Sequence, residues 1–134
     1  SPVDTYIIEY REPGQAGVPG RLVGACLTDR QGDGLSMIYS FFEPDDEERP
    51  GMGNYIIMDH ILRARKTGLP YVYLGYWVEG SKRMQYKVRY QPLERLGAGG
   101  WTRFDGSGSR SEVPQVRSSP AVIEPRELAE LFRK

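Results

Sequence analysis

Residues 54–78, NYIIMDHILRARKTGLPYVYLGYWV, contain the change of hydrophobic periodicity that decides the fold of this chain. Over residues 54–67 the apolar side chains recur every three or four positions, which predicts a helix with one buried face. Gly68 stands where a helix C-cap is expected, and Pro70 prevents the helix from continuing. The apolar run 71–78 then predicts a strand, so the helix is expected to pack against a sheet.

Three segments before this helix predict strands joined by turns. They cover residues 3–11, 22–28 and 35–42. Residues 12–20 contain three glycines and two prolines and predict a loop, and Asp33-Gly34 is typical of a hairpin turn. The last of the three strands, LSMIYSFF, is apolar at both alternating sets of positions, which is typical of a strand covered on both faces of a sheet.

Shorter elements are expected after residue 78. Ser81 predicts the N-cap of a helix that runs to about residue 88, and residues 90–94 and 101–104 predict further strands. The order of elements predicts an α/β (α+β) domain over residues 1–104, with a mixed, mostly antiparallel sheet flanked by helices.

The C-terminal quarter of the sequence has a different composition. Residues 105–120 are rich in Ser, Gly and Pro and predict a flexible linker. Residues 121–134 predict a C-terminal tail, in which residues 124–133 are expected to form a short helix.

The composition excludes several classes of protein. A chain of 134 residues with 39% hydrophobic residues suits one folded domain. No apolar run approaches the roughly 18 residues that span a membrane, and no signal peptide is visible. Cys26 is the only cysteine and His60 the only histidine, so no internal disulfide, no zinc site and a cytoplasmic location are expected. Cys26 is interpreted as a small core residue, and His60, placed off the apolar face of its helix, as structural or merely solvated.

The net charge of zero conceals an uneven distribution along the chain. Residues 1–52 contain ten acidic and four basic residues, whereas residues 53–103 contain nine basic and three acidic residues. Such asymmetry indicates an anionic partner, for instance a nucleic acid, for the middle of the chain. An ordinary solvated surface would give the same distribution.

Residues 71–90, YVYLGYWVEGSKRMQYKVRY, form the strongest candidate for a binding site. The strand ends at Tyr76 and Trp77, and ligands tend to bind where strands of open α/β sheets end. Four cations then lie within eight residues, interleaved with Tyr86 and Tyr90, and they are Lys82, Arg83, Lys87 and Arg89. Cations with aromatic rings suit a nucleic-acid end, since charges meet phosphates and rings stack on bases. The alternative is that the rings are core and the charges form a solvated helix face.

Two weaker signals flank the helix at residues 54–67. Gly51, Gly53 and Asn54 stand at its expected N-terminus, where bare backbone N–H groups hold anions; ordinary loop chemistry would explain the same glycines. Glu43 opens an acidic run that follows a central strand, and it is a candidate to accept a proton from an amine.

Three segments resemble the C-terminal domain of the aminoacyl-tRNA–protein transferases, a family that includes the arginyltransferases and their bacterial leucyltransferase relatives. They are residues 34–44 (GLSMIYSFFEP), 68–77 (GLPYVYLGYW) and 80–94 (GSKRMQYKVRYQPLE). The resembling core consists of Gly75-Tyr76-Trp77, Lys82, Met84, Tyr86-Lys87 and Pro92, within a match over residues 1–104. Gly80-Ser81 with Gly100-Trp101 is more similar to the bacterial aspartate/glutamate leucyltransferases than to the eukaryotic arginyl enzymes, which tend to have Cys at the position of Ser81.

This resemblance implies a GNAT-like N-acyltransferase fold and the transfer of an amino acid from aminoacyl-tRNA to proteins that begin with Asp or Glu. The product enters N-end-rule degradation. Leucyl-tRNA is the favoured donor, arginyl-tRNA remains open, and no cofactor beyond the aminoacyl-tRNA co-substrate is expected. Family members normally carry an additional N-terminal region with a cysteine cluster, so that region is expected to be required as a partner.

Within this resemblance each candidate residue receives a role. Tyr86, Lys87 and Glu43 are the catalytic candidates, with Tyr86 hydrogen-bonded to the ester carbonyl and Glu43 accepting a proton. The binding candidates contact the aminoacyl-adenosine end, the tRNA phosphates or the acidic acceptor side chain, and they are Gly51, Gly53, Asn54, Tyr76, Trp77, Lys82, Arg83 and Arg89.

Two other functions remain open from the sequence. A coenzyme-A-dependent N-acetyltransferase would share the fold, but one residue separates Arg49 from Gly51 where the GNAT phosphate loop normally has two. A non-catalytic tRNA-binding module would use the same cations without transferring anything.

Overall fold

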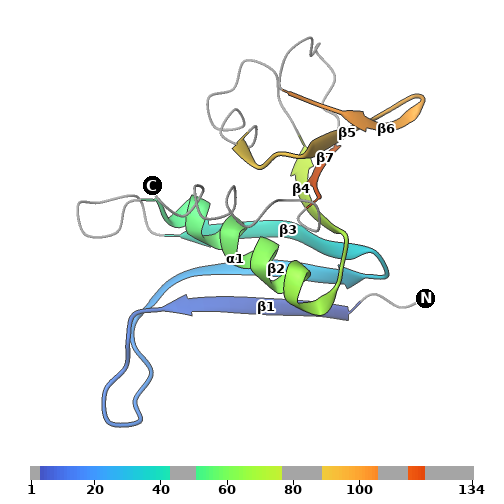
Figure 1. Ribbon diagram of the computed structural model, residues 1–134. Helices are drawn as coiled ribbons and strands as arrows, with labels where there is room; N and C mark the ends of the chain where they lie inside the picture. Colours follow the sequence, from blue (N-terminus) through green and yellow to red (C-terminus); the bar gives the residue numbers. More distant parts are fainter. Residues whose placement is uncertain (1–3, 43–50, 77–88, 106–114, 120–134) are drawn as a thin grey trace.

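The computed structural model describes residues 4–42, 51–76, 89–105 and 115–119, which form seven strands and one helix (Figure 1). The elements are β1 (Asp4–Arg11), β2 (Leu22–Gln31), β3 (Gly34–Phe42), α1 (Met52–Thr67), β4 (Tyr71–Tyr76), β5 (Leu93–Gly97), β6 (Gly100–Arg103) and β7 (Gln115–Ser118).

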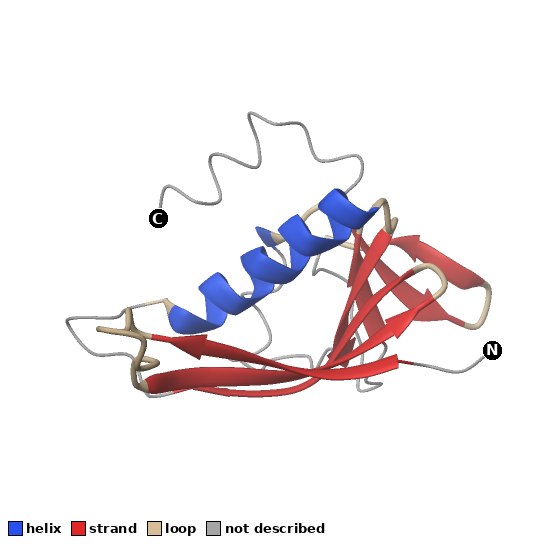
Figure 2. Cartoon of the chain, turned by 90° about the horizontal axis from the view of Figure 1, so that it is seen from below, coloured by secondary structure: helices blue, strands red, loops and turns tan. Residues whose placement is uncertain are grey.

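All seven strands belong to one sheet with the order β1-β2-β3-β4-β7-β5-β6. β3 and β4 run parallel, and the other neighbouring pairs in the described part of the chain are antiparallel. α1 makes the crossover between the two parallel strands and lies on one face of the sheet (Figure 2). The predicted α+β class and the mixed, mostly antiparallel sheet are therefore confirmed. The second predicted helix, at residues 81–88, and the terminal helix lie outside the described residues.

The ends of α1 follow from the glycines that flank it. Gly51 precedes the helix with φ of 81° and Gly68 follows it with φ of 76°, both in the left-handed region. The backbone N–H of Gly68 donates to the carbonyl of Arg65 and that of Leu69 to the carbonyl of Ala64, which satisfies carbonyls of the last turn. The C-cap predicted at Gly68 is confirmed.

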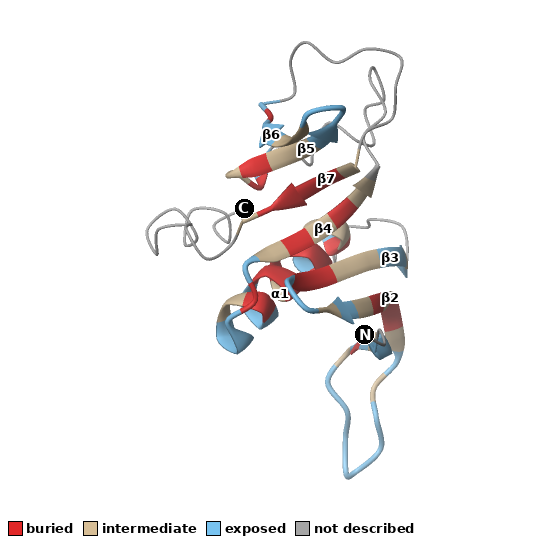
Figure 3. Cartoon of the chain, turned by 90° about the vertical axis from the view of Figure 1, so that its right-hand side faces the viewer, coloured by how far each residue is buried: buried red, intermediate tan, exposed pale blue. Residues whose placement is uncertain are grey.

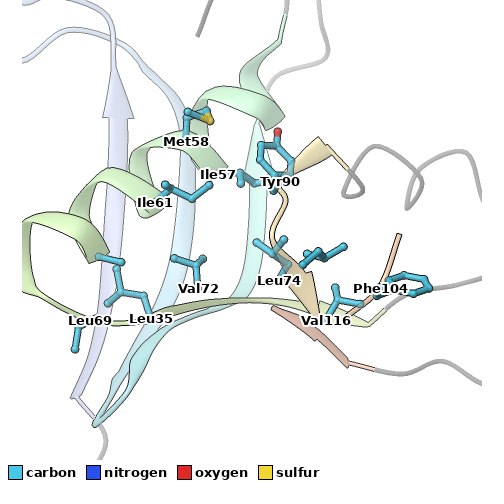
Figure 4. Close-up of a cluster of buried hydrophobic side chains, with 12 residues drawn as sticks. Leu35, Ile57, Met58, Ile61, Leu69, Val72, Leu74, Tyr90, Phe104 and Val116 are labelled. Atoms are coloured by element: carbon cyan, nitrogen blue, oxygen red, sulfur yellow. The ribbon is translucent and has the colours of Figure 1, made fainter. Parts of the chain in front are cut away.

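The main core forms between α1 and the strands β3 and β4, and it continues to Leu93 of β5 and Val116 of β7 (Figures 3 and 4). Ile57, Met58 and Ile61 of the helix meet Val72 and Leu74 of β4, and all five are buried. Full burial of one such aliphatic side chain contributes about 1.5–3 kcal/mol. A second, smaller cluster joins the first half of α1 to β1 and β2, through Tyr10, Val23, Cys26, Met52 and Ile56.

The structure corrects the linker expected over residues 105–120. Residues 115–118 within it form β7, which pairs with β4 on one side and with β5 on the other. Four residues bounded by Ser, Gly and Pro carry little local signal for a strand. β7 depends on hydrogen bonds to two strands that are distant in sequence, and on burial of Val116 in the main core.

β3 also differs from its expectation. Its apolar residues predicted a strand covered on both faces of the sheet. Within the described part of the chain only the face toward α1 is covered, and Tyr39 and Phe41 on the other face are exposed. No helix among the described residues is long and apolar enough to cross a membrane.

Candidate functional site

The two parallel strands separate toward their carboxyl ends. β3 and β4 pair only from Gly34–Ser36 to Tyr71–Tyr73. Beyond that point β3 follows β2 as far as Phe42, while β4 follows β7 as far as Tyr76. Both departures coincide with irregular registers, and on β4 Gly75 adopts a φ of 89° that other residues rarely adopt. We call this point of divergence the β3/β4 splay.

The N-terminus of α1 lies beside the splay. Gly53 in its first turn packs so closely on the end of β3 that an added Cβ would lie 3.2 Å from Cζ of Phe42. Asn54 Oδ1 accepts a hydrogen bond from the Tyr90 hydroxyl, which ties the same turn to the segment that precedes β5. The helix start thus stands between the end of β3 and the chain around residue 90.

This helix start has properties that suit an anionic group. No side chain of the described residues caps it, and its first turn contains no acidic residue. The first N–H groups of a helix lack intrahelical partners and carry a partial positive charge. Gly51, at the cap position, is exposed and has no atom within 4 Å of an added Cβ. Met52 after it is buried, and Gly53 and Asn54 are half-buried, so the exposed part of this turn is its cap residue.

Five of the predicted site residues lie in the described part of the chain. Gly51, Gly53 and Asn54 lie together at the start of α1, as expected, although the amide oxygen of Asn54 is engaged by Tyr90. The backbone of Tyr76 ends β4 opposite Gln115. Arg89 is exposed. Six candidates lie outside the described residues: Glu43, Trp77, Lys82, Arg83, Tyr86 and Lys87.

Tyr90 corrects part of the predicted site. Its ring is fully buried in the main core, with the hydroxyl on Asn54 and the Arg89 guanidinium 5.8 Å from the ring centroid (Figure 4). A ring sealed between α1 and β5 cannot stack on a base. The interpretation of Tyr90 as a base-stacking ring among the cations is therefore wrong.

No local sequence signal predicted the group of side chains centred on Arg117 of β7. The Arg117 Nε lies 2.7 Å from Glu94 Oε1 on β5, and its guanidinium carbon lies 3.6 Å from the ring centroid of Tyr71 and 4.0 Å from that of Trp101. Nη1 also donates to the Tyr73 hydroxyl at 3.3 Å. These contacts link β4, β5, β6 and β7 on the sheet face away from α1. Because Arg117 is buried and its donors already have partners, it is not a ligand-binding cation.

His60 is also structural, although on the opposite side from the one predicted. It lies on the buried face of α1, where Nδ1 is 2.8 Å from the carbonyl oxygen of Ile56 and Nε2 is 2.8 Å from the Thr28 hydroxyl of β2. A carbonyl only accepts, so Nδ1 carries the proton and Nε2 accepts from Thr28. Burial lowers the pKa of His60, which keeps the ring neutral.

Cys26 is fully buried next to Thr28, and burial raises the pKa of its thiol. A buried thiol with a raised pKa is a poor nucleophile. The interpretation of Cys26 as a core residue is confirmed, and neither Cys26 nor His60 belongs to the candidate site.

Comparisons with known proteins identify the family. Residues 1–97 match the family model described as arginine-tRNA-protein transferase, C terminus. The chain is 69% identical over 105 residues to an aspartate/glutamate leucyltransferase of Rhizorhabdus wittichii, covering 78% of this chain and 40% of the relative. It is 67% identical over 116 residues to the enzyme of that name from Sphingomonas elodea, covering 87% of this chain and 45% of the relative.

A third relative, the aspartate/glutamate leucyltransferase of Rhodopseudomonas palustris strain TIE-1, is 55% identical over 119 residues, or 86% of this chain and 46% of the relative. The chain thus spans less than half the length of these curated relatives. No solved structure matches it at a significant level. Because the family model covers most of the chain, the protein belongs to the arginine-tRNA-protein transferase family and corresponds to its C-terminal part.

Proposed function

We propose that this chain is the acyl-transfer part of an enzyme that moves leucine from leucyl-tRNA to the N-terminal Asp or Glu of acceptor proteins. The observation that carries the proposal is the identity of 69% and 67% to two proteins named aspartate/glutamate leucyltransferase. The transferred residue converts an acidic N-terminus into a destabilising one, so the product would be directed to degradation in the cytoplasm. The relatives offer no support for the alternative of coenzyme-A-dependent acetylation.

The β3/β4 splay supports a GNAT-like arrangement for this reaction. Where β3 and β4 separate, backbone groups that would otherwise pair across the sheet become available to a substrate that enters between them. The start of α1 adds N–H donors at the same place. In this proposal the aminoacyl-adenosine end enters the splay, bounded by Tyr76 and Trp77, and a phosphate or carboxylate meets the backbone at Gly51 and Gly53.

The chemistry requires little assistance from side chains. The neutral α-amine of the acceptor attacks the ester carbonyl, a C–N bond forms, the ester C–O bond breaks, and the ribose hydroxyl of the tRNA leaves with a proton. An α-amine with a pKa near 7.7–8.0 is about one-tenth neutral at pH 7. Orientation of the two reactants supplies up to roughly 7–11 kcal/mol, and donors at the developing oxyanion add to it.

The remaining candidates complete this scheme. Tyr86 donates to the ester carbonyl, and Glu43 accepts the proton that the amine loses. The phosphates of the tRNA or the acidic side chain of the acceptor are neutralised by four cations, Lys82, Arg83, Lys87 and Arg89. Arg89 is exposed, as this role requires.

A transfer assay tests the proposal. The chain is joined to the part of the Sphingomonas elodea relative that lies outside the match, and labelled leucyl-tRNA or arginyl-tRNA is supplied with peptides that begin with Asp, Glu or Ala. The expected result is leucine on the Asp and Glu peptides and none on the Ala peptide. Transfer of arginine would correct the donor, whereas salt-sensitive tRNA binding without transfer would replace the enzyme by a binding module. Binding of acetyl-coenzyme A with no dependence on tRNA would contradict the proposal outright.

A further inference from the structure

The sheet face opposite α1 is apolar over its first three strands, with Ile7, Tyr39 and Phe41 exposed around a half-buried Leu27 and a buried Ala25. Ile7 of β1 pairs with Leu27 of β2, which pairs with Tyr39 of β3, so these three side chains form one row across the sheet. In the next row Ala25 pairs with Phe41. We call these five residues the β1–β3 patch.

The orientation of the β1–β3 patch follows from the alternation of side chains along each strand. Ile8 and Cys26, the neighbours of Ile7 and Leu27, pack in the cluster beneath α1. The patch therefore points away from the helix, and Figure 2 shows no described helix or strand on that side of β1–β3. Ile7 is 68% exposed, Tyr39 is 67% exposed and Phe41 is 51% exposed.

The other half of the same sheet face is covered by its own side chains. Tyr71 and Trp101 enclose the Arg117 guanidinium there, and Glu94 neutralises it. The β1–β3 patch has no such arrangement: it presents aliphatic and aromatic side chains in adjacent rows. Contiguous exposed apolar surface of this kind marks an interaction site.

We propose that the β1–β3 patch is the docking surface for the segment that the longer relatives carry ahead of the matched region. The curated relatives extend well beyond the match, which covers only 40–46% of their length, and the family model describes the matched part as a C terminus. The additional segment therefore lies mainly before it.

The shape and chemistry of the β1–β3 patch suit an amphipathic helix of that segment. A sheet is stably buried when a helix or a second sheet packs on its apolar face. Branched and aromatic side chains on neighbouring strands form a surface into which one apolar helix stripe fits. Polar residues border the patch, with Glu9 beside Ala25 and the Thr5–Asp29 hydrogen bond of 2.7 Å beyond Ile7. They would face the polar flanks of such a helix.

Cysteine protection tests this docking. Cys26 is fully buried, so a maleimide added to the folded chain reports on an introduced cysteine. The variants Tyr39→Cys and Ile7→Cys probe the patch, and Leu62→Cys, at a residue 40% exposed on α1, is the matched control. Labelling is followed by peptide mass spectrometry in the 134-residue chain and in the same chain joined to the upstream part of the Sphingomonas elodea relative.

The expected result is that joining the upstream part slows labelling of Tyr39→Cys and Ile7→Cys at least tenfold and leaves Leu62→Cys unchanged. Equal rates at Tyr39→Cys in the two proteins would overturn the proposal. Protection that already exists in the 134-residue chain and grows with protein concentration would also overturn it, because a second copy would then occupy the patch.

A second measurement keeps the test valid if the shorter chain does not fold alone, which rapid labelling of Cys26 would reveal. In the joined protein, Tyr39→Asp should lower the urea midpoint of unfolding clearly, since it places a charge in the proposed contact, while Leu62→Asp should leave the midpoint nearly unchanged. Similar midpoints for the two variants would contradict docking on the patch, whatever the transfer activity of the protein.

Discussion

At the scale of single residues, two buried polar side chains organise opposite faces of the sheet. Arg117 stays charged because the ion pair with Glu94 balances its charge and the rings of Tyr71 and Trp101 contact its guanidinium. His60 stays neutral because burial opposes its protonation, while Thr28 and Ile56 satisfy its two nitrogens. The cost of burying a polar group is thus offset by an ion pair at Arg117 and by two hydrogen bonds at the neutral His60.

Arg117→Ala should destabilise the fold by about 3 kcal/mol, because it removes a buried cation and leaves Glu94 unpaired. Urea denaturation followed by circular dichroism measures this loss. Arg63→Ala is the matched control: it breaks a more exposed ion pair with Asp59 and should cost roughly 0.5 kcal/mol. Equal losses for the two variants would show that the enclosure of Arg117 contributes nothing.

His60 should make stability depend on pH in the range where few other groups titrate. Its pKa is lowered in the folded state, so as the pH falls the unfolded chain, with a pKa of about 6.5, binds a proton first. The contribution of His60 is complete above pH 6.5 and is lost progressively below it. Urea midpoints measured from pH 7.5 to 5.5 should fall in the native chain and fall less in His60→Gln. The same slope in both proteins would assign the effect to other groups.

At the scale of elements, α1 is positioned by its two ends. Its C-terminus is closed by backbone hydrogen bonds at Gly68 and Leu69. Its N-terminus is left open at Gly51 but is held against β3 through Gly53 and against the chain before β5 through Asn54. These contacts anchor the first turn of α1 beside the β3/β4 splay, where the proposed function places its backbone donors.

Gly68→Ala should cost about 1 kcal/mol, since a residue with a Cβ is strained at a φ of 76°. No atom lies within 4 Å of the added Cβ, so steric contact adds nothing to that strain. Gly32→Ala is the control, because this glycine also has open space around it but no positive φ. A thermal unfolding series should show a loss for Gly68→Ala alone.

Tyr90→Phe should lower stability by about 1 kcal/mol, because it removes the hydroxyl donor to Asn54 and keeps the buried ring. If this link also holds the start of α1 in place for the donor, the variant in the joined enzyme should raise KM for leucyl-tRNA more than it lowers kcat. Urea denaturation and steady-state kinetics measure the two effects, and unchanged stability would show that the hydrogen bond is dispensable.

At the scale of the whole molecule, the two faces of the sheet are covered in different ways. The face toward α1 is closed by the main core, and the parallel strands that emerge from that core separate at their carboxyl ends. The opposite face is self-covered over β4–β7 and apolar over β1–β3. The proposed transfer would use the edge of β3 that separates from β4, whereas the proposed docking would use the side chains of Tyr39 and Phe41 on its face away from α1, so different variants test the two proposals.

Lys87→Ala in the joined enzyme should reduce kcat/KM for leucyl transfer about tenfold to a hundredfold, as expected for a lost contact to a charged group worth roughly 1.5–3 kcal/mol. Lys66→Ala, which removes an exposed cation from the last turn of α1, is the matched control and should leave transfer unchanged. Unchanged transfer in Lys87→Ala would remove this residue from the proposed scheme.

Much of the fold was predictable because its signals are local. The apolar spacing before Gly68, the cap itself and the hairpin signal each depend on residues a few positions apart. The structure confirms the helix, its cap and the hairpin, whose turn lies at Gly32-Asp33 because Gly34 of β3 already pairs with Gln31 of β2. Of the candidate site, the grouping of Gly51, Gly53 and Asn54 at the start of α1 followed from the same helix signal.

Other features arise from contacts between residues that are far apart in the chain. β7 becomes a strand because β4 and β5 pair with it, Tyr90 becomes core because α1 closes over it, and His60 faces inward because Thr28 supplies a partner. The sequence by itself determined α1 and the strands β1 to β4, since propensity, periodicity and caps act over a few residues. The tertiary structure alone decided which polar and aromatic groups are buried, because burial depends on what packs against each of them.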